Sequence, residues 1–202
     1  MTCIVGIADG GAVWIGGDSA GVDERFNLVI RSDPKVFRVG EIVMGFTTSF
    51  RMGQLLRYRL KAPEIPPEMD VAEYMATVFI DAVRECLKDG GFAEKTADRE
   101  RGGTFLVGIR GRLFKIEDDY QVGESVRGFE ACGGGDQVAL GSLFTTRSIG
   151  DDVRRRITTA LESAAAMTAV VQGPFVIVST EDNAGVRATA ALRSPERLSA
   201  RA

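Results

Sequence analysis

The chain opens with the stretch "MTCIVGIADGGAVWIGGDSAG" (residues 1–21), and this stretch decides the expected fold. Thr2 heads an alternating apolar run, and residues 2–8 and 12–19 are typical of two strands joined by a tight Asp-Gly-Gly turn. An acidic residue, Asp18, then follows in a second, glycine-flanked turn. No basic stretch or apolar leader precedes the first strand, so no secretory signal is expected. A threonine at the second position, directly before the first strand, requires an explanation.

Composition and charge exclude several classes of protein. Of the 202 residues, 45% are hydrophobic and 26% are charged, which is typical of a soluble globular protein. The net charge of −3 provides no basic field for nucleic acid or anionic lipid, and no apolar run approaches the roughly 20 residues that span a bilayer. The three cysteines, Cys3, Cys86 and Cys132, are expected to be reduced and buried, which favours a cytoplasmic location.

The chain contains no histidine. This excludes every Ser-His-Asp or Cys-His catalytic arrangement and every histidine-ligated metal site. No Cys-x-x-Cys pair occurs either, so neither a metal nor another cofactor is expected. If the protein performs nucleophilic catalysis, its base must be a lysine, a carboxylate or the α-amino group of the chain.

Hydrophobic periodicity and turn residues predict separate blocks of strands and helices. Further strands are expected at residues 35–40, 41–46, 104–111, 112–118, 120–125, 128–135 and 174–180, and helices at 49–61, 70–89, 136–147 and 151–168. This order predicts an α+β fold in which two sheets pack face to face, with a helix pair on each outer side. Residues 1–185 are expected to form a single domain, and the polar, arginine-rich residues 186–202 a mobile tail.

Several short motifs occur in an order that resembles one family. They are Thr2, the turn at 16–19, Lys35, the Gly45-Phe46 pair and the glycine run at 133–135. Together they resemble the proteasome β-subunit family, and especially the bacterial proteasome-like peptidase that works with a hexameric unfoldase. The resemblance covers about residues 2–180. It implies an N-terminal nucleophile hydrolase with a four-layer αββα sandwich.

The resemblance also explains the threonine at the second position. In this family the first residue of the mature chain is the nucleophile, and its free amine is the base. Removal of Met1 would give Thr2 both roles. A free α-amino group has a pKa of about 8, close enough to neutrality to accept the hydroxyl proton directly or through a water.

Other positions acquire roles through the same resemblance. Asp18 and Lys35 match the conserved acid and lysine beside the nucleophile, and the lysine charge would favour ionisation of the hydroxyl. The backbone N–H of Thr48 matches the oxyanion donor. The substrate pocket implied by the resemblance consists of Phe46, Thr47, Ser49, Ala20 and Gly21.

Each of these residues also has an ordinary interpretation. Thr2 could be a β-favouring residue on an edge strand, and Asp18 a turn residue. Lys35 could be a solvated lysine on a strand, and Phe46 a core residue. Cys3 could serve as the nucleophile only if Thr2 were removed as well.

The sequence departs from the family pattern at three places. Thr47, Thr48 and Ser49 replace a small glycine-containing loop, and Gly134 stands where the family has a serine. No acid occurs among residues 164–167, where the family has one in its last long helix. The serine and the acid assist the amine through hydrogen bonds in the family.

The function that the resemblance implies is a threonine peptidase in a self-compartmentalising homomeric ring. Its substrates would be unfolded polypeptides or peptides, an ATP-dependent unfoldase is a possible partner, and neither nucleic acid nor a membrane is expected. Two alternatives are a catalytically silent ring or scaffold subunit and an amidohydrolase that acts on a small amide.

Two stacked rings are expected, joined through the helix at 70–89 and the short helix after Phe46. In the short helix, apolar and aromatic residues alternate with arginines, as in interfaces: Phe50, Leu55, Leu56 and Tyr58 with Arg51, Arg57 and Arg59. A local ion-paired surface is the alternative for this helix.

Overall fold

The computed structural model describes residues 2–23, 25, 27–96, 99–150 and 152–182. It mixes α-helices and β-sheets, as the sequence predicts. The strands are β1 (Cys3–Asp9), β2 (Ala12–Gly17), β3 (Ala20–Val22), β4 (Leu28–Ile30), β5 (Val36–Val39), β6 (Ile42–Phe46), β7 (Glu94–Thr96), β8 (Arg99–Arg101), β9 (Phe105–Ile109), β10 (Arg112–Ile116), β11 (Val122–Glu124), β12 (Phe129–Gly133) and β13 (Val176–Ser179). The helices are α1 (Phe50–Tyr58), α2 (Val71–Tyr74), the π-helical segment η1 (Met75–Phe79), α3 (Ile80–Asp89), α4 (Asp136–Thr146) and α5 (Val153–Met167).

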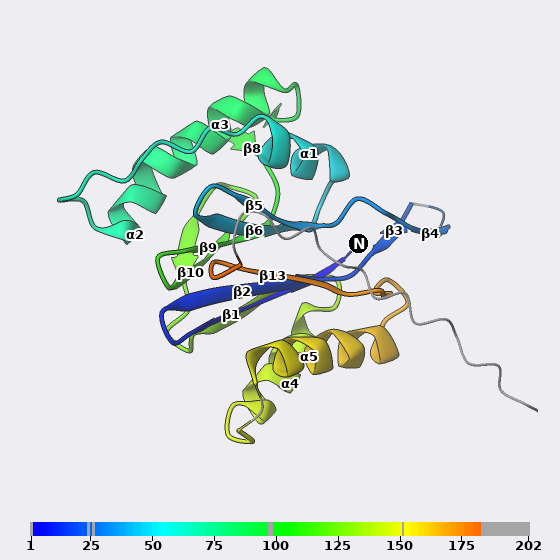
Figure 1. Cartoon of the computed structure of the whole chain (residues 1–202). Coiled ribbons are helices and arrows are strands. Elements are labelled where there is room, and N and C mark those ends of the chain that lie inside the picture. Colours follow the sequence, from blue (N-terminus) through cyan, green and yellow to red (C-terminus); the bar gives the residue numbers. More distant parts are fainter. Residues whose placement is uncertain (1, 24, 26, 97–98, 151, 183–202) are drawn as a thin grey trace, which may run out of the picture.

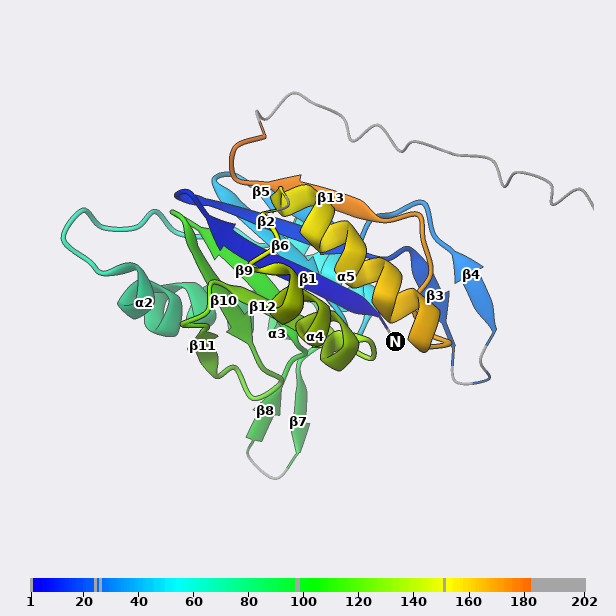
Figure 2. The same ribbon diagram turned by 90° about the horizontal axis from the view of Figure 1, so that it is seen from below.

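Two antiparallel sheets lie in the middle of the molecule. Their strand orders are β12-β1-β2-β13 and β11-β10-β9-β6-β5. Figure 1 shows α1, α2 and α3 on the outer side of the second sheet, and α4 and α5 on the outer side of the first. Figure 2, turned by 90°, shows α4 and α5 lying across β12, β1 and β2.

The alternation of side chains along β1 explains why the first sheet is covered on both faces. Ile4 faces the second sheet and belongs to a buried cluster with residues such as Val43 and Leu106. Cys3 and Val5 point the other way, into a cluster with the buried faces of α4 and α5. Because successive strand residues point to opposite faces, an apolar strand such as β1 requires apolar partners on both sides.

The first helix is shorter than predicted, and its apolar residues have a different role. Its last residue is Tyr58 rather than Lys61, and the Ser49 hydroxyl caps its first turn by accepting from the Arg51 N–H at 3.1 Å. Leu55 and Leu56 are fully buried in the core against the second sheet, so they are unavailable for contacts between subunits. The interface composition predicted for this helix was therefore wrong for both leucines.

The helix predicted from Asp70 is divided by the π-helical segment η1. The Thr77 hydroxyl donates to the Glu73 carbonyl at 2.7 Å, the carbonyl that a regular α-helix would pair with the Thr77 N–H. Apolar spacing of three and four residues continues through this segment, so the sequence pattern contains no sign of the interruption.

Two further hairpins, β3–β4 and β7–β8, were not predicted. In the first, the Asp23 carboxylate accepts from the backbone N–H groups of Arg25 and Asn27 at 2.9 Å, which closes the turn. The strand that follows exposes three consecutive apolar residues, Leu28, Val29 and Ile30. Strand β4 does not pack on the core, so its residues do not alternate between apolar and polar. The pattern by which half-buried strands are predicted is therefore absent from it.

The remaining expectations have mixed outcomes. None of the described helices is long and apolar enough to cross a membrane. All three cysteines are free thiols, and Cys3 and Cys132 are buried as predicted. The prediction of burial was wrong for Cys86, which is half-buried because it lies at the edge of the α1–α3 contact, where its thiol approaches the Leu55 carbonyl at 3.6 Å. The tail predicted at 186–202 lies outside the described residues, and the domain limits remain a prediction.

Candidate active site

Three chain segments meet at one end of the two sheets and bring Thr2, Asp18 and Lys35 together. Thr2 directly precedes β1, and Asp18 directly follows β2; because Ile4 pairs with Gly17, these two strand ends are neighbours. Lys35 comes directly before β5 in the opposite sheet, where its carbonyl accepts from the Phe46 N–H at 3.1 Å. The site therefore lies between the two sheets and takes residues from both.

The Lys35 ammonium connects the other two side chains. Its Nζ donates to Thr2 Oγ1 at 2.7 Å and to Asp18 Oδ1 at 2.8 Å. Thr2 is 5% exposed, and Asp18 and Lys35 are each 1% exposed. Burial rules out a solvated strand lysine, and β1 lies between β12 and β2 rather than at a sheet edge.

The Asp18 carboxylate is fully engaged. Besides the lysine, Oδ1 accepts from the Cys3 N–H, and Oδ2 accepts from the Ala20 N–H, each at 3.0 Å. A buried ion pair is tolerated when its remaining lone pairs are satisfied in this way. Asp18 therefore anchors both the lysine and the backbone that follows Thr2.

Burial lowers the pKa of the Lys35 ammonium, and the Asp18 carboxylate opposes this effect. Burial also raises the pKa of the Cys3 thiol to about 12, with further contributions from Asp18 and then from Asp136. Cys3 therefore remains a protonated thiol at neutral pH, which argues against it as a nucleophile. The lowered pKa of Lys35 makes its proton easier to share with the Thr2 oxygen.

Strand β12 approaches Thr2 closely because Gly133 has no side chain. A Cβ atom at Gly133 would lie 2.2 Å from the Thr2 carbonyl oxygen, and its φ of +104° also favours glycine. The glycine run at 133–135 was predicted to be a strand-to-helix turn, and in the structure it links β12 to α4. Asp136, the first residue of α4, was missed by the sequence analysis, although it directly follows the glycines.

The segment between β6 and α1 holds the expected oxyanion donor. Thr48 has a φ of +61°, and its N–H donates to the hydroxyl of the buried Thr47. The Thr48 hydroxyl accepts from the Thr104 N–H at 3.1 Å. The Thr48 N–H thus has a side-chain acceptor that an incoming oxyanion would have to replace.

Phe46 is a core residue in the structure. Its ring leaves no room for a side chain at Gly53 of α1, and it lies edge-to-face with Phe50 at a centroid distance of 5.7 Å. The ring that faces the lysine is that of Phe50, with Lys35 Nζ 5.7 Å from its centroid. Phe46 therefore contributes to the site indirectly, by packing against the ring of Phe50.

Arg31 is the residue beside the site that sequence reasoning missed. Its guanidinium lies 3.9 Å from the Phe50 ring centroid and forms two hydrogen bonds of 2.7 Å with Asp33. Its aliphatic stem passes along Gly21, where a Cβ would lie 3.1 Å from Arg31 Cδ. Residues 31–35 form the connection between β4 and β5, so no strand periodicity indicated that Arg31 lies beside the site.

The missing acid among residues 164–167 can be followed in the structure. Ala164 is fully buried in the contact of α5 with the first sheet, so no carboxylate reaches the site from there. The described residues contain no group of three or more acidic or cysteine side chains that could hold a metal ion. Asp136 is the further carboxylate whose charge is felt at Cys3.

Comparisons with known proteins identify the fold. No protein-family model and no curated protein sequence matches the chain. Among solved structures, BPH from Thiobacillus denitrificans in complex with epoxomicin superposes with a TM-score of 0.73 at 19% identity, over 88% of this chain and 97% of that chain. Eukaryotic HslV from Trypanosoma brucei superposes with a TM-score of 0.64 at 17% identity, over 88% and 98%. Anbu, an ancestral β-subunit from Yersinia bercovieri, gives 0.61 at 18%, over 88% and 81%.

The chain shares the fold of these proteins. The resemblance to the proteasome β-subunit family is therefore confirmed at the level of the fold.

Proposed function

We propose that this protein is a threonine peptidase of the N-terminal nucleophile type, and that its layers form the four-layer αββα sandwich of that class. The observation that carries the proposal is the buried contact of Lys35 Nζ with Thr2 Oγ1 and Asp18 Oδ1, at 2.7 and 2.8 Å. A hydroxyl that accepts from a buried ammonium is stabilised as it loses its proton. An ordinary core threonine has no need of such a partner.

The proposed reaction begins after Met1 has been removed. Thr2 Oγ1 attacks the carbonyl carbon of the scissile peptide bond, and its proton passes to the Thr2 α-amine directly or through a water. The tetrahedral oxyanion accepts from the Thr48 N–H in place of the Thr47 hydroxyl. The C–N bond then breaks, the departing amine takes the proton from the α-ammonium, and water later hydrolyses the ester on Thr2 with the amine as base.

The substrate pocket is proposed to lie beside Thr2, between the segment at 47–49 and the start of β3, with the Phe50 ring at its base. Gly21 forms the β3 side and leaves space for the Arg31 stem, whereas Ala20 is fully buried. Arg31 borders this pocket and shares its charge with Asp33, so an acidic side chain before the scissile bond would compete with Asp33 for the guanidinium. Phe46 contributes through its support of Phe50 rather than by direct contact.

Assembly into a homomeric ring is part of the same proposal. Tyr58 of α1 and the three apolar residues of β4 are 46–71% exposed, and an exposed apolar edge strand is a typical site of contact between chains. A ring would enclose Thr2 in a lumen, receive unfolded polypeptides, and provide a surface for an ATP-dependent unfoldase.

Intact-mass spectrometry of the purified protein tests the chemistry. We expect the mass to show loss of Met1, and incubation with a peptide epoxyketone such as epoxomicin to add one inhibitor to Thr2, because this reagent reacts with both the hydroxyl and the amine of an N-terminal threonine. The Thr2→Ala variant is the matched control and should remain unmodified. Retention of Met1 together with no adduct would favour a catalytically silent subunit.

Light scattering coupled to size exclusion tests the assembly. A closed ring should be present at micromolar concentration, and Val29→Glu on β4 should weaken it, whereas Val126→Glu, at another exposed valine, should not. A monomer or simple dimer that still forms the epoxyketone adduct would overturn the ring and favour the amidohydrolase that acts on a small amide.

A further inference from the structure

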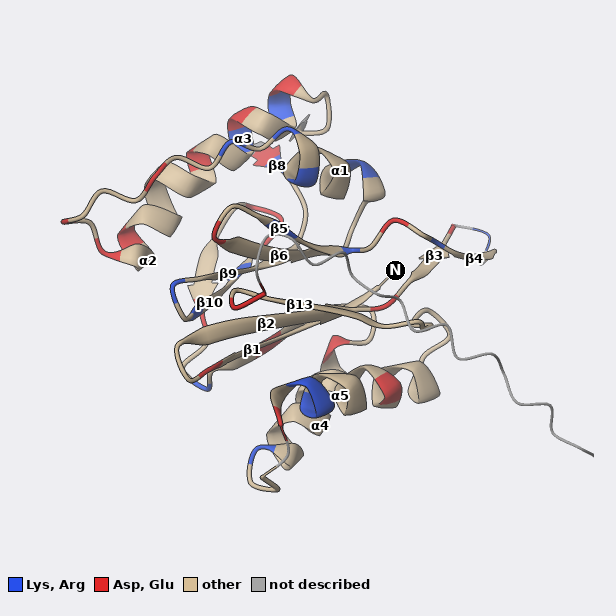
Figure 3. Ribbon diagram, in the orientation of Figure 1, with Lys and Arg blue, Asp and Glu red and all other residues tan. Residues whose placement is uncertain are grey.

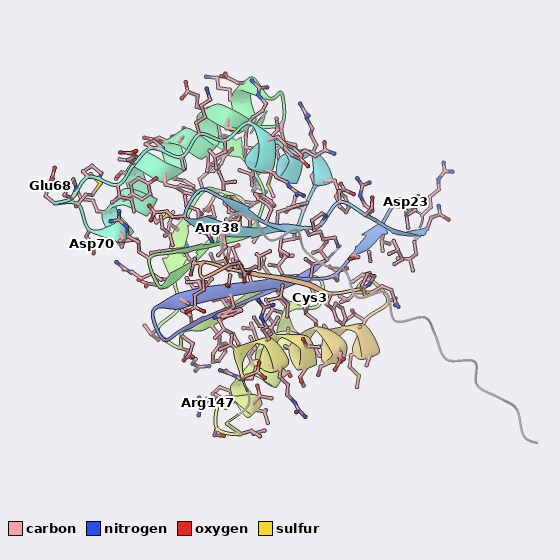
Figure 4. The ribbon with its side chains drawn as sticks, viewed as in Figure 1. Cys3, Asp23, Arg38, Glu68, Asp70 and Arg147 are labelled. Carbon is pink, nitrogen blue, oxygen red and sulfur yellow. The ribbon has the colours of Figure 1, made fainter. Side chains whose placement is uncertain are left out.

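The far end of β1 carries a second charged cluster, which the proposed peptidase chemistry does not use. Ile7, Ala8 and Asp9 line a hollow of about 220 Å³ together with Arg127, Gly128, Phe129, Arg147 and Arg156. Cys3 and Asp9 are six residues apart along an extended strand, so this hollow lies about 20 Å from Thr2. Figure 4 shows Arg147 and Cys3 well apart, with Arg147 beyond the end of α4.

Three different elements place the arginines at this hollow. Arg127 lies in the turn before β12, which is held by the Gly128 N–H to the Ser125 carbonyl at 3.2 Å and by the Ala8 N–H to the Gly128 carbonyl at 2.7 Å. Arg147 is the C-cap residue of α4, and Arg156 lies in the first turn of α5. Figure 3 shows the basic residues at the start of α5 and in the connection from α4.

These arginines have few partners within the protein. In the described part of the chain, none of the three forms a salt bridge. The Arg127 and Arg147 guanidinium groups lie over the Phe144 ring, at 5.3 and 3.8 Å from its centroid. Arg156 donates from one nitrogen to the Leu143 carbonyl at 3.4 Å, but its buried Nε has no hydrogen-bond partner among the residues that the structure describes. By contrast, the neighbouring Arg154 is paired with Asp182 at 3.2 Å.

The local negative charge does not neutralise three guanidinium groups. The carbonyl end of α4 contributes the equivalent of roughly half a negative charge, and Asp9 contributes one more. Among the described residues that line the hollow, positive charge therefore exceeds negative charge, in a chain whose net charge is −3.

We propose that this hollow binds a small polyvalent oxyanion, of the phosphate or polycarboxylate kind. Guanidinium groups match the oxygens of such anions by paired hydrogen bonds, and three of them on separate elements can surround one ligand. The exposed Phe144 ring holds two of the guanidiniums in place by cation–π contact. The site is separate from Thr2 and does not depend on the proposed peptidase activity.

Calorimetric titration at low ionic strength tests this site, with inorganic pyrophosphate and citrate as probes and sodium chloride at matched ionic strength as the blank. We expect saturable binding of one anion per chain for at least one of the two probes. Arg147→Gln and Arg127→Gln should each weaken it about tenfold or more. Arg101→Gln is the matched control, because it removes the same charge from an exposed ion pair with Asp118; its binding should stay within twofold.

Failure of both probes to bind would overturn the proposal. So would equal weakening by Arg101→Gln and Arg147→Gln, because that result would assign the binding to the overall charge of the protein. If Arg156 only caps α4, then Arg156→Gln should lower the melting temperature while leaving anion affinity unchanged, and this outcome would also contradict the site.

Discussion

Strand β1 has charged side chains at both of its ends, and the two ends differ in how that charge is neutralised. At the first end, the Lys35 charge is buried and paired with Asp18, whose oxygens are all occupied. At the other end, Arg127, Arg147 and Arg156 have no carboxylate within ion-pair distance among the described residues. The Lys35 ammonium, which is paired with Asp18, contacts the Thr2 hydroxyl. The three arginines at the other end are not paired with any carboxylate of the described residues, so their charge remains available for a ligand.

The same difference governs the energetics of the two ends. Breaking a buried pair leaves an uncompensated charge in a medium of low dielectric constant, which is strongly destabilising. Removing one of several like charges at a half-exposed hollow relieves repulsion instead. Substitutions at the two ends should therefore differ in size and in sign.

The largest expected effect is the loss of catalysis at the paired end. Thr2→Ala should lower kcat for peptide hydrolysis by about 10⁴-fold or more, because the nucleophile is gone while the Lys35–Asp18 pair remains. Thr2→Ser should keep part of the activity. Peptide hydrolysis and thermal unfolding of the purified variants provide the test, and full activity in Thr2→Ala would show that Thr2 is not the nucleophile.

Next in size is the loss of the ion pair itself. Lys35→Ala should abolish activity and lower the free energy of unfolding by about 3–5 kcal/mol, because Asp18 is left buried and unpaired. The double variant Lys35→Met with Asp18→Asn should recover most of the stability but none of the activity. Arg101→Ala, which breaks an exposed pair, should cost less than about 1 kcal/mol. Similar denaturation midpoints for Lys35→Ala and Arg101→Ala would show that the buried ion pair contributes no more to stability than the exposed one.

Cys3 gives the paired end a specific pH dependence. The pKa of its thiol rises from 9.0 to about 12 on folding, so between these pH values the unfolded chain binds fewer protons. Stability should therefore fall with increasing pH by about 1.4 kcal/mol per unit from this group, and the loss should be smaller in Cys3→Ala. The lowered pKa of Lys35 acts in the opposite direction, so the informative quantity is the difference between wild type and variant in urea unfolding from pH 8 to 11.

Arg31 should have a moderate effect that is confined to substrate choice. Arg31→Gln should lower kcat/KM about tenfold for peptides with Glu before the scissile bond and leave Leu peptides within about twofold, because one charge-assisted contact is lost. Asp33→Asn is the complementary variant and should favour Glu peptides. An equal loss for both peptide types would assign Arg31 to structure rather than to specificity.

The smallest effect is expected at the unpaired end. Added salt should stabilise the wild type more than Arg147→Gln, by less than about 1 kcal/mol, because screening relieves repulsion among the three arginines. Thermal unfolding at 10 and 500 mM salt measures this difference. A larger salt response in the variant would mean that Arg147 is already neutralised within the protein.

The sequence by itself determined most of the strands and helices and which residue types are available for chemistry, but it did not predict the β3–β4 and β7–β8 hairpins or the segment η1. Apolar alternation along residues 2–19 and helical spacing in α5 are local properties, so they could be read directly. The absence of histidine restricted the base to an amine or a carboxylate, and the motif order from Thr2 to the glycine run indicated the family. The sequence thus indicated Thr2, Asp18 and Lys35 as candidate catalytic residues, and the structure brings the three side chains into contact.

Only the tertiary structure decided how the charges are paired. Lys35 and Arg31 lie four residues apart and look alike in sequence, yet Lys35 is buried between two sheets while Arg31 lies half-exposed on the Phe50 ring. Likewise, Arg154 pairs with Asp182, far away in sequence, and lies over the Trp14 ring, whereas Arg156 donates to the Leu143 carbonyl. Burial and ion pairing depend on contacts between distant segments, which follow from the packing of the layers rather than from local pattern.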